Sequence, residues 1–131
     1  MQINEIVSKS PESDHELRQA ISQFVHWVIK KLDIQDELPK FDLSYDQLTA
    51  QKLHRTGSYE WHNNIMTVYV LNRNLVDILR TVAHEMTHKK QAEEGRIHQK
   101  NPPGSKLEQE ADATAGYLMK LYSKEHREIF Q

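Results

Sequence analysis

The sequence His84-Glu85-Met86-Thr87-His88 constrains this chain more than any other stretch. Two histidines four residues apart lie on one face of an α-helix, so both imidazole rings can bind the same metal ion. Glu85 lies about a quarter-turn away, where its carboxylate can reach a water molecule beside that ion. The pattern therefore predicts a helix with two metal ligands and a candidate proton acceptor.

The apolar residues around this motif predict the same helix independently. They recur three or four residues apart and form a stripe separate from the histidine face: Leu75, Ile78, Leu79, Val82 and Met86. Asn72 or Asn74 can cap the start of this helix. Because the chain has eight histidines, an accidental match has a chance of roughly a few per cent.

Length and composition limit the kind of protein. The 131 residues suffice for a single domain, residues 1–131, with a modest core. A net charge of -2 from 17 basic and 19 acidic residues, without a block of Lys or Arg, argues against a nucleic-acid partner. Because the chain has no cysteine, any metal must be held by histidine and carboxylate.

The sequence shows no basic region followed by an apolar run at its amino terminus, and no segment has the length of a membrane span. We therefore expect a cytoplasmic protein without a membrane partner. We also expect a monomer.

Three elements are predicted ahead of the metal helix. A helix from about Ser13 to Lys31 begins with a capping-box pattern and has apolar residues at helical spacing. Residues Phe41–Tyr45 alternate apolar and polar as a half-buried strand does. Residues Ser58–Trp61 and Ile65–Leu71 flank a polar turn, which predicts a hairpin. The segment from residue 46 to residue 55 is ambiguous.

A second helix with acidic residues is predicted to begin near Ser105, after a loop at residues 95–104. Its apolar stripe is Leu107, Ala111, Leu118 and Tyr122. Glu108 and Asp112 are four residues apart and share another face. Ser105 and Glu108 have capping-box form, although Glu108 cannot both cap the helix and bind a metal.

Glu110 is the alternative third ligand. It lies about 200° around the helix from Glu108, so the two side chains cannot face one ion. The pairing of Glu108 with Asp112 favours Glu108, in which case Glu110 is a solvated acid. The whole layout is then α+β, with helices on one face of a short, mostly antiparallel sheet.

The motif His-Glu-x-x-His, a gap of nineteen residues after His88, and Glu108-x-x-x-Asp112 together resemble the gluzincins, the thermolysin-type zinc peptidases. In size and layout the chain is similar to the minigluzincins, single zincin-like domains with an amino-terminal helix, a three-stranded sheet, an active-site helix and a glutamate helix. It also looks like phage and bacterial proteins that share a Gly-x-Tyr hairpin, here Gly57–Tyr59, and an Ala-Gly-Tyr sequence, here Ala115–Tyr117.

The resemblance implies a role for each matching residue. His84, His88 and Glu108 would bind one catalytic Zn²⁺, Glu85 would be the general base, and Asp112 would orient a ligating imidazole. The second lobe of thermolysin, with the histidine that steadies the oxyanion, has no counterpart here.

Three further residues have open roles. His98 in the loop is a fourth ligand, a substrate contact or an exposed polar residue. Tyr117 and Tyr122 are candidate oxyanion donors, although an aromatic residue at helical spacing is more often part of the core.

The expected activity is zinc-dependent hydrolysis of peptide bonds in a peptide or protein substrate. An extended substrate could pair with an exposed sheet edge, for which Ile65–Leu71 is the candidate because it leads into the metal helix. Two alternatives remain: a catalytically inactive, zinc-stabilised binding or regulatory module, and a module without metal.

Overall fold

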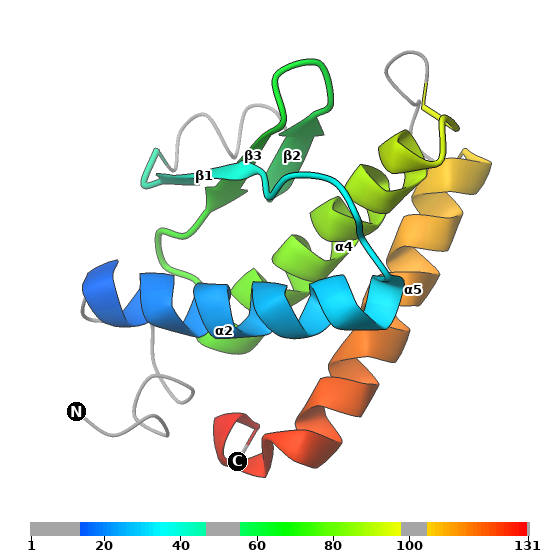
Figure 1. The fold of residues 1–131 in the computed structure, drawn as a ribbon. Coiled ribbons are helices and arrows are strands. Elements are labelled where there is room, and N and C mark those ends of the chain that lie inside the picture. Colours follow the sequence, from blue (N-terminus) through cyan, green and yellow to red (C-terminus); the bar gives the residue numbers. More distant parts are fainter. Residues whose placement is uncertain (1–13, 47–55, 98–104, 131) are drawn as a thin grey trace.

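In the computed structural model, which describes residues 14–46, 56–97 and 105–130, three long helices lie on one side of a three-stranded sheet (Figure 1). The elements follow one another as α2 (Asp14–Leu32), β1 (Lys40–Ser44), β2 (Gly57–Glu60), β3 (Ile65–Tyr69), α4 (Leu75–Glu93), α5 (Lys106–Glu125) and a short 3₁₀ helix, η1 (Arg127–Ile129). The expected α+β class is confirmed, and the described residues form one small domain. Ser13 and most of the ambiguous segment 46–55 lie outside the described residues.

Helix α4 lies at the centre of this arrangement. It packs against α2, against α5 and against the sheet (Figure 1). All five residues of its predicted apolar stripe are fully buried. They meet the buried face of α2, which consists of Leu17, Ala20, Ile21, Phe24, Val25 and Val28. The core therefore includes the interface of these two helices, and buried residues of the sheet and of α5 extend it.

The ends of α4 are fixed by local interactions. The side chain of Asn74 accepts a hydrogen bond from the backbone N–H of Asp77 at 2.9 Å, so the predicted cap is Asn74. Gly95 follows the helix with a φ of 72°, which glycine adopts without strain, and the Arg96 N–H closes the end by donating to the Gln91 carbonyl. Asn74 and Gly95 thus set the length of α4.

The sheet is mixed, with the strand order β1-β3-β2. The hairpin is confirmed, because β2 and β3 pair antiparallel across the turn at residues 61–64. The expectation of a mostly antiparallel sheet is wrong, because β1 pairs parallel with β3. The alternation in residues 41–45 predicts a strand but contains no information about the direction of its partner.

The strand order also corrects the proposed substrate edge. Strand β3 is the central strand and pairs on both sides, so residues 65–69 cannot accept a further strand. Within the described residues, β2 pairs only with β3, and β2 is the edge strand that packs against α4.

Asn64 joins three elements at the hairpin turn, where its φ is 54°. Its Nδ2 donates to the carbonyls of Glu37 and Leu38 in the connection between α2 and β1. Its Oδ1 accepts hydrogen bonds from the Tyr59 hydroxyl at 2.7 Å and from Lys89 Nζ at 3.0 Å. The sequence predicted only that this residue tolerates a turn conformation.

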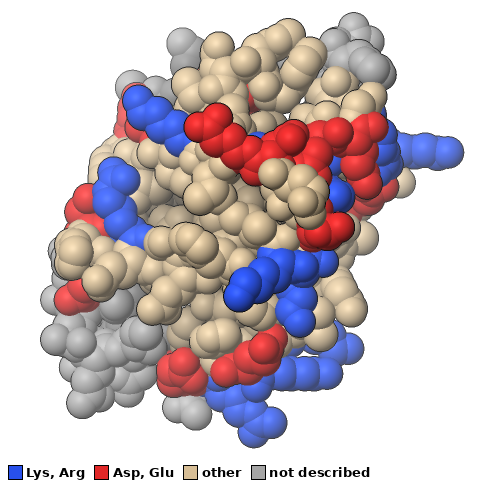
Figure 2. All heavy atoms as spheres, in the orientation of Figure 1, with Lys and Arg blue, Asp and Glu red and all other residues tan. Residues whose placement is uncertain are grey.

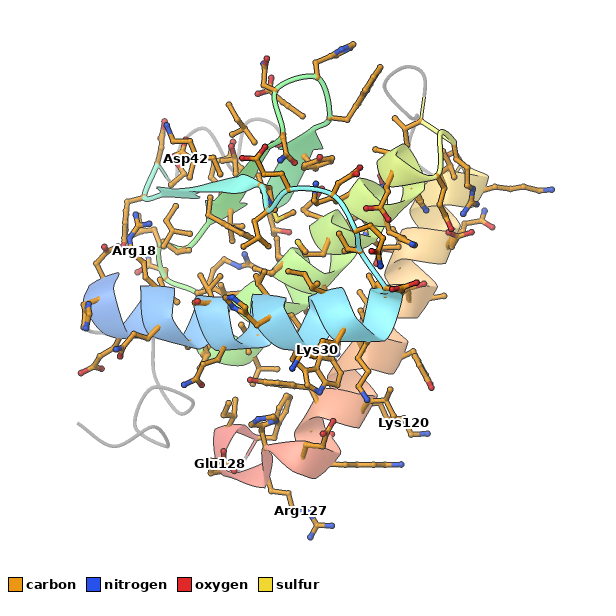
Figure 3. All side chains as sticks on the ribbon, viewed as in Figure 1. Arg18, Lys30, Asp42, Lys120, Arg127 and Glu128 are labelled. Carbon is orange, nitrogen blue, oxygen red and sulfur yellow. The ribbon has the colours of Figure 1, made fainter. Side chains whose placement is uncertain are left out.

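The exterior carries charges of both signs. Figure 3 labels six exposed side chains that point outward from several elements: Arg18, Lys30, Asp42, Lys120, Arg127 and Glu128. Among the described residues, no helix is long and apolar enough to cross a bilayer.

Gly57 allows β2 to lie close to α4. A Cβ atom at this position would lie 2.6 Å from Thr81 Cγ2 and 3.0 Å from the backbone oxygen of Thr67. The Thr81 methyl group cannot easily rotate away, because Arg73 Nη2 donates to Thr81 Oγ1 at 2.7 Å. The first residue of β2 must therefore be glycine if the strand is to keep this position.

We expect Gly57→Ala to lower the free energy of unfolding of the metal-free protein by about 1 to 3 kcal/mol through overpacking. Gly116→Ala is the matched control: its nearest atom would be 3.9 Å away, and alanine in a helix interior is favoured over glycine by about 1 kcal/mol. Urea unfolding curves measure both changes. Equal effects of the two substitutions would contradict the close packing of β2 on α4.

Candidate metal centre

His84, His88 and Glu108 converge between α4 and α5. His84 Nε2 lies 3.1 Å from Glu108 Oε2, and His88 Nε2 lies 2.8 Å from Glu108 Oε1. One ligand atom from each residue lies within 4.8 Å of the others. In the described residues this is the one group of histidines and acids that could share a metal ion.

Two local features bring Glu108 to the histidines. Helix α5 packs against α4 through small buried residues, Ala111 and Ala115, which permit a close approach. The hydroxyl of Ser105 accepts a hydrogen bond from the Glu108 N–H at 3.3 Å, so this half of the predicted capping box forms. The Glu108 side chain instead contacts both imidazole rings.

Each imidazole also has a partner on its second nitrogen. His84 Nδ1 lies 2.9 Å from Asp112 Oδ1, and His88 Nδ1 lies 2.7 Å from Gln91 Oε1. Metal-ligating histidines commonly donate their second N–H to a carboxylate or carbonyl oxygen in this way. The Asp112 contact is the one that the sequence predicted, whereas the Gln91 contact was not predicted.

The donor set fits a metal ion. With each Nδ1 donating to an oxygen, each neutral imidazole presents a lone pair on Nε2, and both lone pairs face the Glu108 carboxylate. A cation bound among these three groups would interact favourably with both lone pairs and with the carboxylate. Two imidazole nitrogens and one carboxylate oxygen match the His₂Glu ligand set of catalytic zinc sites.

Glu85 lies on the side of α4 that faces the sheet. Its carboxyl-bearing side chain is buried, and a Cβ atom on Gly57 would lie 3.4 Å from Glu85 Cγ. Glu85 is therefore beside the first residue of β2 while it is also the sequence neighbour of His84. The candidate proton acceptor thus packs against the edge strand, whereas His84 and His88 on the same helix face α5.

Glu110 belongs to a different group of side chains. Its carboxylate accepts hydrogen bonds from both Nη atoms of Arg96, at 2.8 and 2.7 Å, and from Gln91 Nε2 at 3.1 Å. The Arg96 guanidinium, with help from Gln91, lowers the pKa of Glu110. The Glu110 side chain is 41% exposed, as a solvated acid is, and its pairing with Arg96 was not predicted from the sequence.

The three residues with open roles have different positions. His98 lies outside the described residues. Tyr117 is 61% exposed and follows Glu108 by nine residues, about half a turn around α5, so the structure does not bring it to the ligands. Tyr122 is buried against Phe24 and Trp27, and burial raises its pKa to about 12, so the core interpretation holds for this tyrosine.

A cavity of about 370 Å³ lies next to α4, lined by Asp36, Glu37, Tyr59, Trp61, Asn64, Lys89, Ala92 and Glu93. Lys89 is four residues beyond Glu85 on the same helix face, and burial lowers the pKa of its ammonium group. Figure 2 shows a band of acidic side chains over the connection between α2 and β1 and the adjacent end of α4. The charged residues that line the cavity are three acids and Lys89.

Comparison of the chain with protein-family models, with curated proteins and with solved structures found no match. The likeness to gluzincins consequently rests on the sequence motif and on the geometry described above.

We expect His84→Ala and Glu108→Ala to abolish tight zinc binding, because each removes one of three protein ligands. Asp112→Ala should lower zinc affinity by about 10- to 100-fold, because it removes the carboxylate that contacts Nδ1 of His84. Competition with a chelator measures the ranking, and His15→Ala, on the exposed face of α2, is the control. An unchanged zinc affinity in the His84→Ala variant would contradict the assignment of His84 as a metal ligand.

Proposed function

We propose that this protein is a zinc-dependent metallopeptidase of the gluzincin type. The observation that carries the proposal is the convergence of His84, His88 and Glu108 from two helices, with Glu85 beside them on the sheet side of α4. A structural metal site needs only the ligands. The adjacent carboxylate, in the helix position that a proton acceptor requires, favours hydrolysis.

His84, His88 and Glu108 would hold the ion, and zinc bound by three protein ligands polarises a carbonyl group and makes water more acidic. The protein contributes the position of this ligand set. His84 and His88 are fixed by one rigid helix, and their Nδ1 partners restrict the rotation of both rings. Glu108 comes from a second helix and completes the set through its contacts with both rings.

Glu85 acts as the general base in this proposal. It accepts a proton from the water molecule that attacks the peptide carbonyl carbon, and it delivers that proton to the amine nitrogen as the C–N bond breaks. Its position suits this role because packing restricts it: its residue is buried at 7% exposure and lies against Gly57 of β2. A restricted carboxylate loses little freedom when the substrate binds.

An extended peptide would bind along the outer edge of β2. Within the described residues this edge has no strand partner, and backbone hydrogen bonds of a substrate could continue the sheet there. The beginning of β2 is next to Glu85, and Tyr59 further along lies near Lys89 at the cavity. A substrate on this edge would thus extend from the proposed base towards the cavity.

We expect Glu85→Gln to keep its fold and its zinc while peptide hydrolysis falls by about 100- to 10,000-fold, because no group would accept the proton of the water. Cleavage of a peptide library and the zinc content of the same samples measure both quantities. Glu128→Gln on the exposed η1 is the control.

Activity of Glu85→Gln within about tenfold of wild type would show that Glu85 is not the base. A wild-type protein that binds zinc and cleaves no peptide would instead support the zinc-stabilised module.

A further inference from the structure

Gln91 makes three hydrogen bonds from one buried side chain. It lies on α4, three residues after His88, and only 1% of its surface is exposed. Its Oε1 is 2.7 Å from His88 Nδ1, and its Nε2 donates to the Leu107 carbonyl and to Glu110 Oε1, both at 3.1 Å. The residue therefore connects a candidate ligand on α4 with the first turn of α5.

The two acceptors of Nε2 determine which way the Gln91 amide faces. A backbone carbonyl has no proton to donate, and both oxygens of the Glu110 carboxylate already accept hydrogen bonds from the Arg96 guanidinium. Both groups therefore require the NH₂ end of the amide. The amide oxygen must then face His88, because the reversed amide would place two oxygen acceptors against one another.

The orientation of this amide fixes the tautomer of His88. An amide oxygen only accepts hydrogen bonds, so the proton between His88 and Gln91 belongs to Nδ1 of the histidine. The neutral ring then has its lone pair on Nε2, the atom that faces Glu108. Gln91 thus selects the nitrogen through which His88 can bind a metal.

The contacts continue to the exposed surface. Arg96 pairs with Glu110 through two hydrogen bonds, and its Nη1 also lies 3.3 Å from Glu94. Of these two acids, Glu110 is the one that accepts a hydrogen bond from Gln91. The two parallel hydrogen bonds from Arg96 restrict the rotation of the Glu110 carboxylate. The carboxylate in turn restricts the orientation of the Gln91 amide.

We propose that Gln91 is a positioning residue for metal binding, and that the Arg96–Glu110 pair holds it in place. The inference rests on the metal site of the proposed function but not on peptide hydrolysis. It also gives Glu110 a role. This acid holds the Gln91 amide that contacts His88, and it does not bind the ion itself. The partner of His84 differs, because the Asp112 side chain is 76% exposed whereas Gln91 is buried.

Gln91→Met tests the proposal, because methionine fills a similar volume and cannot accept the His88 proton with comparable strength. Zinc affinity should fall by about 10- to 100-fold. In heteronuclear NMR spectra of the metal-free protein, the hydrogen-bonded Nδ1 proton of His88 should be present in wild type and lost or shifted in the variant. If Gln91 had only a packing role, the signal of the His88 Nδ1 proton would be the same in the variant as in wild type.

A double substitution provides a rescue. Gln91→Glu keeps an acceptor for His88, but its second oxygen would face the Glu110 carboxylate. Combining it with Glu110→Gln supplies a donor at position 110 again, although the Leu107 carbonyl stays without its donor, so the pair should recover part of the zinc affinity that the single variant loses. The single Gln91→Glu variant should bind more weakly than the pair.

Two alanine variants complete the experiment. Glu110→Ala should reduce zinc affinity less than Gln91→Met, and Glu94→Ala should leave it unchanged, although both acids contact Arg96. Equal losses in these two variants would show a general charge effect and overturn the proposal. Unchanged zinc affinity together with an unchanged His88 signal in Gln91→Met would overturn it as well.

The failure of each proposal is distinguishable. Zinc binding without peptide cleavage in wild type would overturn the peptidase and leave the role of Gln91 intact. Cleavage that depends on Glu85, with a zinc affinity that does not depend on Gln91, would overturn the role of Gln91 alone.

Discussion

The rotation of about 100° per residue along α4 is the constraint on which the rest of the structure depends. It divides one helix into surfaces with different tasks. The apolar stripe faces α2, the histidine face meets α5, and Glu85 and Lys89 face the hairpin strand. The core and the candidate site are therefore coupled, because a change in the packing of α4 would move the ligands and the proposed base together.

The interface between α4 and α5 contains the three candidate ligands and the polar partners of both imidazoles. Glu108 lies between two imidazoles, and the second nitrogen of each imidazole has its own oxygen partner. Burying such a set costs free energy unless every donor and acceptor is satisfied. A bound cation would remove the remaining cost, and in a domain of this size it would add stability that the core alone supplies only modestly.

The sequence predicted those features that depend on local spacing. Helical periodicity located α4 and its buried stripe, and the pairing of Glu108 with Asp112 identified the acid that meets the histidines. The direction of β1 and the central position of β3 could not be read from alternation, because both depend on pairing between distant segments. Gln91 was missed for a related reason: its spacing from His88 places it on the ligand face, but its importance depends on Glu110 in another helix.

X-ray absorption spectroscopy of the zinc-loaded protein tests the central claim most directly. The account predicts four light ligands at about 2.0 to 2.1 Å, with the outer-shell scattering of two imidazole rings. Removal of Glu108 should change the first shell and preserve the two-imidazole signal. A six-coordinate shell of oxygen atoms without imidazole scattering would contradict a metal centre formed by His84, His88 and Glu108.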